Sequence, residues 1–573
     1  MKFVFLLSAA TALCLVTAAH ANPALEGYSN HAAFTQRVQQ FAESDLVAVT
    51  SLGKSIGGRD VWLLTIGSGK PDEKPALAVI GNVHAPHLAG GEIALRMAEQ
   101  LVNQAGDDEQ IQKLLAAHTF YFIPRPNPDG CEKAFTKPYR EQAGNDRQTD
   151  DDRDFKFAED PPDDLNGDGF ITMMRVEDPS GTHLPHPDDP RVLIEADTKK
   201  NERGKYRLLL EGRDDDGDEQ FNEDGGDGVS LNKNYPFGYK PFTVAAGANA
   251  VSEPEYRALA DFLFDRPNIA AIFSFSPEDN LYHPWKPNPQ NDGSRIKTSV
   301  QATDASALDY LATEYRKLHG GNDAPESPAA AGSFSQWGYY HYGRWSLAVR
   351  GWWIPKTAEQ PGEEKTDDEK PAEGASEEKT AVKKPSGEKR GSDDVNRLRW
   401  FEQQDIDGFV DWQVVQHPDF PGKTVEVGGF KPFYSLNPPA KELDGLATKH
   451  VKFLTKLPPW LPDLTISETE AELLGGGVYR ITATVANRGY LATMTDMGRL
   501  NGEAYPLQVS LALPKETIFL QGHPRTRLPR LAGAGGKAES TWLVRFPAEV
   551  PASVEINAFA PSVGSASTVL ETK

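Results

Sequence analysis

The chain has 573 residues, 39% of them hydrophobic, and its 83 acidic residues exceed its 60 basic residues by 23. This length allows roughly two to four domains. The negative charge argues against nucleic acids and anionic membrane surfaces as partners.

The N-terminus predicts export. Lys2 precedes an apolar run from Phe3 to Val16, and Ala19-His20-Ala21 has the small-x-small pattern of a cleavage site. We therefore expect a signal peptide over 1–21 and a secreted or periplasmic protein. No later stretch is apolar enough to predict a membrane span. After the expected cleavage Cys131 is the only cysteine, so no intramolecular disulfide is possible and we expect a buried thiol.

Apolar runs and helical periodicity alternate along the next part of the chain. The patterns predict strands at 46–49, 61–66, 76–80, 120–123, 269–275 and 345–349, and helices at 31–42, 92–102, 253–264, 308–319 and 442–457. Continuous apolar runs such as 76–80 are typical of strands buried on both faces. This order predicts an α/β fold with a mixed sheet.

Two segments interrupt the pattern. Residues 141–228 are rich in Asp, Glu, Gly and Arg, which predicts a long acidic insertion of loops. Residues 356–395 are mostly Lys, Glu, Pro and Ser, and we expect a disordered, protease-sensitive linker because so few apolar residues cannot offset the ordering entropy. Over 459–573 the composition changes to short alternating strands separated by Gly, Pro and Asn, which predicts a C-terminal β-sandwich domain.

Several motifs follow one another along the chain: Ser51–Val61, Gly81-Asn82-Val83-His84 with Glu92, Asn127-Pro128-Asp129-Gly130, Leu231–Pro236, Ser252-Glu253-Pro254-Glu255 and Ser333–Tyr340. In this order they resemble the motifs of one family, the carboxypeptidase A-like zinc metallocarboxypeptidases. The resemblance covers about 30–355 and 396–458. It implies that residues 22–458 form an α/β/α fold around a twisted, mixed eight-stranded sheet.

The resemblance also implies a zinc site, and here the chain departs from the family. The first ligand position holds His84, but the glutamate ligand is replaced by His87. The third ligand position falls on Phe275 or, with a slip of one residue, on Ser276. The general-base position falls on Arg350. Its guanidinium group either replaces the positive charge of the metal or points away from the site. A guanidinium about 5 Å from a dication would cost roughly 6–7 kcal/mol at a dielectric near 20.

The substrate-binding positions are altered as well. Asn232-Lys233 stands in place of the Asn-Arg pair that grips a terminal carboxylate, and the tyrosine of the mobile loop falls near Pro328. Lys233 keeps a positive charge but cannot form a bidentate fork, so it either binds an acidic group weakly or is a solvated lysine.

The insertion contains three runs of alternating acidic residues, which suit calcium because calcium prefers several oxygen ligands. An acidic solvated loop is the alternative. The candidate calcium ligands are Asp150, Asp152, Asp154, Asp164, Asn166, Asp168, Asp214, Asp216 and Asp218.

Three functions are compatible with these patterns. The first is a secreted carboxypeptidase-like protein, catalytically impaired or inactive, that binds a peptide or cell-surface ligand. The second is an active hydrolase whose zinc is held by His84, His87 and a further ligand such as His283 or His341. The third is an extracellular structural or adhesive protein whose working part is the β-sandwich.

Overall fold

The computed structural model describes residues 22–572, except 152, 223, 292, 322, 357–389 and 547–548. The expected signal peptide at 1–21, most of the expected linker at 356–395, and Asp152 therefore lie outside the described residues. Among the described residues, no helix combines the length and apolarity that a membrane crossing needs.

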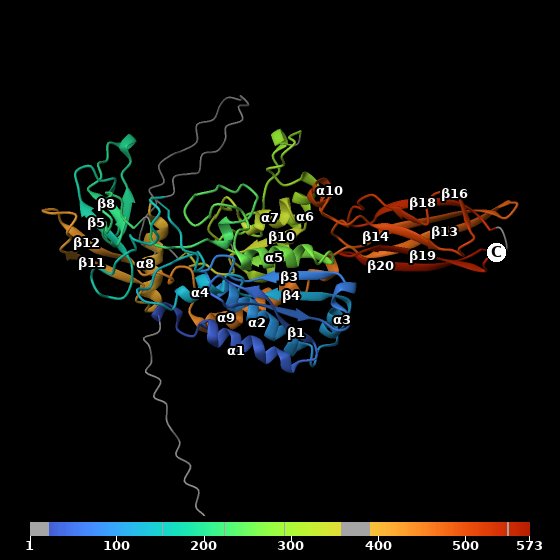
Figure 1. The fold of residues 1–573 in the computed structure, drawn as a ribbon, viewed down its shortest axis with the longest axis horizontal. Coiled ribbons are helices and arrows are strands. Elements are labelled where there is room, and N and C mark those ends of the chain that lie inside the picture. Colours follow the sequence, from blue (N-terminus) through green and yellow to red (C-terminus); the bar gives the residue numbers. More distant parts are fainter. Residues whose placement is uncertain are drawn as a thin grey trace, which may run out of the picture.

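A mixed sheet forms the centre of the molecule (Figure 1). Its strand order is β1-β2-β4-β3-β9-β10, in which β4, β3, β9 and β10 run parallel while β2 pairs antiparallel with both β1 and β4. The strands are β1 Val47–Lys54, β2 Asp60–Ile66, β3 Ala76–Ile80, β4 Thr119–Ile123, β9 Ile269–Phe275 and β10 Trp345–Val349. The described part of this sheet thus has six strands and not the expected eight.

Helices cover both faces of this sheet. They are α1 His31–Gln40, α2 Leu88–Gln104, α3 Glu109–Ala117, α4 Pro128–Lys133, α5 Pro254–Phe264, α6 Ala302–His319, α7 Phe334–Tyr340 and α9 Leu443–Leu454. In Figure 1, α1, α2 and α9 lie on one side of the sheet and α5 on the other. The helix ends follow ordinary capping chemistry: the Asn30 and Asp108 side chains accept backbone N–H groups of α1 and α3, and Gly320 ends α6 in a left-handed conformation.

Alternation along the strands creates one hydrophobic core on each face. On β3, Leu77 and Val79 join the cluster that contains α2, α6 and α9, whereas Ala78 and Ile80 join the cluster that contains α5 and α7. Because successive side chains of a strand point to opposite faces, both faces of an inner strand are buried. Cys131 is buried with a free thiol, as expected.

A second six-stranded sheet corrects the prediction that 141–228 contains only loops. Its order is β11-β12-β5-β8-β6-β7, with β5 Met173–Glu177, β6 His183–Pro185, β7 Leu193–Glu195, β8 Tyr206–Leu210, β11 Phe409–Val415 and β12 Val425–Phe430. The acidic insertion supplies four strands, and the chain beyond the expected linker supplies the other two. Val425 pairs with Val176 where the two segments meet, and both are buried in the small core of this sheet.

The predicted linker also ends too late. Helix α8, Ser392–Gln404, begins inside the range 356–395. Its Val395 and Leu398 are buried against Val192 and Ile194 of the second sheet, while Trp400 packs edge-to-face on Trp352 of the central domain. This helix was missed because its apolar residues follow directly on a long charged stretch.

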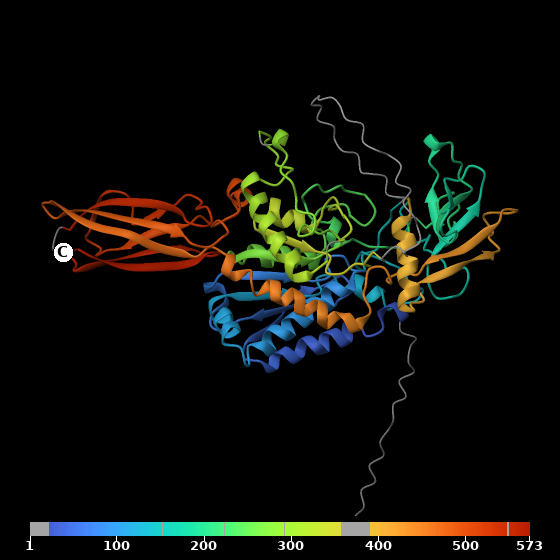
Figure 2. The same ribbon diagram turned by 180° about the vertical axis from the view of Figure 1, so that it is seen from behind.

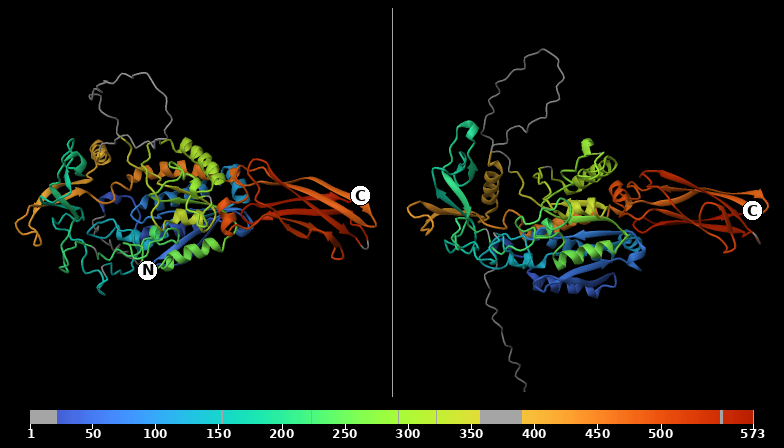
Figure 3. Two further views of the ribbon diagram at one scale, coloured as in Figure 1. Left: turned by 90° about the horizontal axis from the view of Figure 1, so that it is seen from above. Right: turned by 45° about the horizontal axis from the view of Figure 1, so that its top comes forward.

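The C-terminal part contains two four-stranded antiparallel sheets, with orders β13-β14-β18-β16 and β17-β15-β19-β20. The strands are β13 Leu464–Gly475, β14 Val478–Asn487, β15 Gln508–Ala512, β16 Ile518–Gln521, β17 Arg525–Arg527, β18 Gly536–Arg545, β19 Ser553–Ala560 and β20 Gly564–Glu571. Buried residues from both sheets, including Val485, Trp542 and Ile556, form one hydrophobic cluster. In Figures 2 and 3 the second sheet and the C-terminal sheets lie at opposite ends of the elongated molecule.

The C-terminal sheets are joined to the central domain through the short helix α10, Asp496–Asn501. The buried carboxylate of Asp304, at the start of α6, accepts the backbone N–H groups of Asp496 and Met497. It also accepts the hydroxyl of Tyr339 and pairs with Arg530 at 3.2 Å. One buried carboxylate thus joins two parts of the chain.

Candidate functional site

The loop between β3 and α2 carries the first two site residues. Asn82 adopts a left-handed backbone conformation (φ 39°), and its amide donates to the carbonyl of His87 at 2.6 Å. Helix α2 approaches so closely that a Cβ on Gly91 would clash with Asn82, so glycine is required there. Asn437 fixes the end of the loop by donating to the carbonyl of Pro86 and accepting from the N–H of Ala89.

The carboxyl ends of the parallel strands β3, β9 and β10 bring the candidate residues to one edge of the sheet, the edge at which α/β proteins commonly bind ligands. The N–H of Val83 donates to the carbonyl of Phe275 at 3.2 Å, and the N–H of Ser276 donates to the carbonyl of Val349 at 2.9 Å. Arg350 follows directly. The positions after β3, β9 and β10 therefore lie close together in space.

Burial lowers the pKa of both histidines at this edge. Burial, followed by the positive charge of Lys233, lowers the pKa of His84 to about 4. Burial, followed by the charges of His84 and Arg350, lowers the pKa of His87 to about 3. The His87 side chain is 2% exposed, and neither ring nitrogen has a hydrogen-bond partner among the described residues.

Arg350 lies at the expected position of the general base. Its Nε donates to the carbonyl of Pro277 at 3.2 Å, and its backbone N–H donates to Asp279. Burial lowers the pKa of Arg350, while the carboxylates of Asp279 and Glu278 act in the opposite direction. Within the described residues, no hydrogen bond or ion pair engages its two Nη groups.

Glu278 is a buried residue of this site that the sequence reasoning missed. It is 5% exposed and accepts hydrogen bonds from Asn232 Nδ2 at 2.8 Å and from Ser335 Oγ at 3.0 Å. Its position just after the buried strand 269–275 could have indicated it. Ligands of α/β proteins commonly bind at the carboxyl ends of parallel strands, so a charged residue there is a candidate site residue.

The two predicted substrate-binding residues are engaged elsewhere. Asn232 holds Glu278 with its amide nitrogen and accepts the N–H of Phe334 with its oxygen, so neither end is free. Lys233 donates to the carbonyl of Val244 at 3.1 Å. Pro328 is exposed in the loop before α7.

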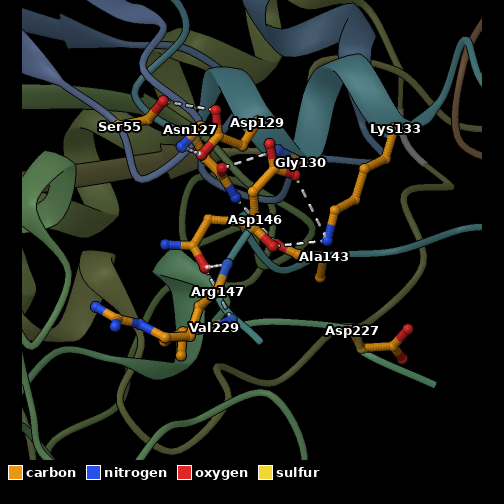
Figure 4. Close-up of polar contacts among 12 residues, drawn as sticks. Ser55, Asn127, Asp129, Gly130, Lys133, Ala143, Asp146, Arg147, Asp227 and Val229 are labelled. Carbon is orange, nitrogen blue, oxygen red and sulfur yellow. Dashed lines mark hydrogen bonds and ion pairs between the residues drawn. The ribbon is translucent and has the colours of Figure 1, made fainter. Parts of the chain in front are cut away.

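Other motifs that carry the resemblance form a network of polar contacts, part of which is drawn in Figure 4. Asp129 accepts hydrogen bonds from Ser55 Oγ, the N–H of Gly57 and Arg59, and Arg59 also contacts Asp146 at 2.6 Å. Asn127 caps its turn by accepting the N–H of Gly130. The network holds the N-terminal strand-turn-strand segment against the start of α4.

Known families match two segments of the chain. A family described as zinc carboxypeptidase matches residues 32–179, and a domain of unknown function matches residues 463–571. Residues 32–179 are therefore similar to the zinc carboxypeptidases.

Individual relatives cover short parts of this carboxypeptidase-like chain. Carboxypeptidase M of Mus musculus is 31% identical over 98 residues, which is 17% of this chain and 22% of the relative. Carboxypeptidase E of Caenorhabditis elegans is 32% identical over 123 residues, which is 20% of this chain and 26% of the relative. The chain thus spans about a quarter or less of the length of these relatives.

Two solved structures resemble the carboxypeptidase-like chain at low sequence identity. Carboxypeptidase A from Helicoverpa armigera is 14% identical, with 55% of this chain and 61% of that chain covered at a TM-score of 0.34. Thrombin activatable fibrinolysis inhibitor is 16% identical, with 57% of this chain and 71% of that chain covered at a TM-score of 0.34. These scores are too low to bear on function.

The carboxypeptidase-like site does not fit the zinc of its relatives. Within the described ranges, no His, Cys, Asp or Glu lies close enough to His84 and His87 to complete a set of three metal ligands. His283 instead contacts the carbonyl of Ala324, and His341 lies against Phe237. Zinc in proteins needs at least three protein ligands, and a cation here would face Arg350.

Among the predicted calcium residues, the structure gathers one trio. Carboxylate oxygens of Asp214, Asp216 and Asp218 all lie within 4.8 Å of one another. Asp164 and Asn166 both accept the N–H of Asp168, which forms a similar turn elsewhere in the insertion. Asp150 accepts the N–H of Phe155 and Asp154 contacts Lys156, so these two belong to a separate loop.

Proposed function

We propose that this chain is an exported carboxypeptidase-like protein that binds a peptide or cell-surface ligand without hydrolysing it through zinc. The observation that carries the proposal is the set of residues at the strand ends. His87 occupies the glutamate ligand position, Phe275 and Ser276 the third ligand position, and Arg350 the place of the base. A metal-bound water would have neither a complete ligand set nor a carboxylate to take its proton.

Metal content and peptidase activity test this proposal together. The purified protein, supplied with zinc, should hold no stoichiometric zinc and release no C-terminal residue from benzoylglycyl peptides ending in Phe, Lys or Glu. His84→Ala is the matched control, because His84 is the one zinc-ligand position at which this chain has the residue type that the resemblance implies. Release that a chelator stops, and that His84→Ala abolishes, would show a working rearranged site and refute the proposal.

We also propose that calcium stabilises the acidic insertion through Asp214, Asp216 and Asp218. Three carboxylates whose oxygens lie within 4.8 Å repel one another, and a bound dication would offset that repulsion. Millimolar calcium should raise the melting temperature, and Asp216→Ala should reduce the rise. The control is Asp309→Asn, an exposed carboxylate on α6. An unchanged melting temperature would refute the calcium proposal and show that these residues form only a solvated acidic loop.

We interpret the two C-terminal sheets as a β-sandwich domain. Their single shared hydrophobic cluster supports this interpretation, because two sheets packed face to face bury their inner side chains together.

A further inference from the structure

The two faces of the second sheet are covered differently. One face packs on the small core of this sheet, which is formed by Met174, Val176, Phe420, Val425 and Val427. Because side chains alternate along a strand, Met173 of β5 points to the opposite face. Leu210 of β8 pairs with Met173 and Leu208 lies two residues before it, so both share that second face. Leu210 is 39% exposed although it is apolar.

The second face borders a cavity of about 560 Å³, a size typical of small-molecule sites. The opposite wall is formed by α8 and by the turns at 140–141 and 431–436. In Figures 1 and 2, α8 stands between the second sheet and the central domain. Most of the lining is apolar and includes Met173, Leu193, Leu208, Leu210, Phe409 and Trp412.

The charged side chains that line this cavity are paired, with one exception. The pairs are Arg140 with Asp227, Arg397 with Asp394, Arg191 with Asp189 and Glu402, and Lys431 with Asp407. The exception is Glu141. Among the described residues, no Lys, Arg or His nitrogen lies within 4.0 Å of its carboxylate. The cavity therefore holds one carboxylate whose charge has no partner at ion-pair distance.

The carboxylate of Glu141 is fixed at the cavity wall. One of its oxygens accepts the backbone N–H of Phe433 at 2.6 Å, and Phe433 has a left-handed backbone (φ 73°) that is uncommon for a bulky residue. Within the described part of the chain, no hydrogen bond engages the other oxygen. Burial raises the pKa of Glu141, while the Phe433 N–H and the charge of Arg397 act in the opposite direction. A partner for the second oxygen would thus have to enter the cavity.

A single carboxylate in an apolar cavity matches a cation with an apolar body. An ammonium group forms strong, charge-assisted hydrogen bonds with a carboxylate, and an alkyl chain gains by leaving water for an apolar wall. An anion would be repelled by Glu141. A sugar would bring hydroxyl groups against Leu208 and Leu210, which offer them no hydrogen bonds. The net charge of −23 also attracts cations to this protein.

From this arrangement we propose that the cavity between the second sheet and α8 binds a primary amine that carries an alkyl chain. The ammonium group pairs with Glu141, and the chain lies along Met173, Leu208 and Leu210. This inference goes beyond the proposed function, because the cavity is built from the acidic insertion, α8 and the turn after β12. The residues at the ends of β3, β9 and β10 do not line it.

Calorimetry with octylamine tests the inference at about pH 8, where the amine is protonated and a carboxylate is ionised. Octan-1-ol is the neutral analogue, octanoate the anionic analogue and butylamine the short-chain analogue. Octylamine should bind at least about tenfold more tightly than octan-1-ol or octanoate, because only its head group pairs with Glu141. It should also bind at least about tenfold more tightly than butylamine, because butylamine buries four fewer methylene groups.

Three variants locate the binding site. Glu141→Gln keeps an acceptor for the N–H of Phe433 and should reduce the preference for the amine over the alcohol to less than about threefold. Leu210→Ala should weaken the binding of amine and alcohol equally, by about threefold to tenfold. The matched control is Glu177→Gln, an exposed carboxylate of β5 that does not line the cavity, and it should leave all affinities unchanged.

Equal binding of amine and alcohol, tighter binding of octanoate, or no binding of octylamine up to about 10 mM would overturn the inference. An unchanged preference in Glu141→Gln, or an equal loss in Glu177→Gln, would do the same. Melting curves check that each variant is folded. If Glu141→Gln does not fold, the four ligands on the unaltered protein and on Leu210→Ala still decide. Zinc content and peptide hydrolysis are measured separately, so the proposed function and this inference can fail independently.

Discussion

The carboxylate of Asp304 should control how firmly the C-terminal sheets are attached. It is fully buried and receives two backbone N–H groups from the start of α10, the hydroxyl of Tyr339 and an ion pair from Arg530. Asp304→Ala would leave these donors and the Arg530 charge without their acceptor. Removing one partner of a buried charge pair costs about 3–5 kcal/mol. Asp304→Asn keeps the volume and one acceptor, and should cost about half as much.

Hydrogen exchange measures this loss where it should occur. The amide protons of Asp496 and Met497 donate to Asp304, so a local loss of about 3 kcal/mol should accelerate their exchange roughly 150-fold. The matched control is Asp309→Asn on the same helix, whose exposed carboxylate pairs with Lys286. Its effect should stay within about 0.5 kcal/mol. Unchanged exchange at Asp496 and Met497 in Asp304→Ala, or an equal change in the control, would refute this reasoning.

Two further predictions concern buried carboxylates. Glu92→Gln should lower the free energy of unfolding in urea by about 3–5 kcal/mol, because Glu92 is buried against Arg37, Arg96 and Arg125. The control Glu99→Gln, whose side chain is 37% exposed and pairs with Arg37, should cost less than about 1 kcal/mol. Equal losses would contradict this. Burial raises the pKa of Glu211 from 4.5 to about 7, so the folded chain holds that proton more tightly than the unfolded chain. The free energy of unfolding should therefore fall by about 2 kcal/mol, allowing for solvent screening, as the pH rises through this window. Glu211→Gln should remove that slope in urea midpoints measured across this range, and an unchanged slope would assign it to other groups.

The central sheet was largely predictable because its inner strands are buried on both faces. Strands β3, β9 and β10 coincide with the predicted apolar runs, since such runs have few alternatives once they are bounded by turn residues. The second sheet was not predictable by the same reasoning. Its strand Met173–Glu177 is short, with two charged residues among its five, and its partner Val425–Phe430 lies far along the chain. Local patterns carry no information about such a pairing.

The candidate site shows the same division. Motif order identified His84, His87 and Arg350, and the structure brings these positions to one edge of the sheet. The roles of Glu278 and Asn232 depend on a hydrogen bond between residues 46 positions apart, which the sequence alone did not reveal. Among the described residues the buried Ser276 hydroxyl and Asn82 amide oxygen lack hydrogen-bond partners, which is likewise a property of packing rather than of any motif.

The second sheet can be completed only late in synthesis, because its two segments lie far apart in the chain. Strand β5 cannot pair with its neighbour β12 until roughly 250 further residues have been made, which takes about 25 s at typical rates of synthesis. During that interval the hydrophobic side chains of Met174 and Val176 lack the partners that bury them in the finished sheet.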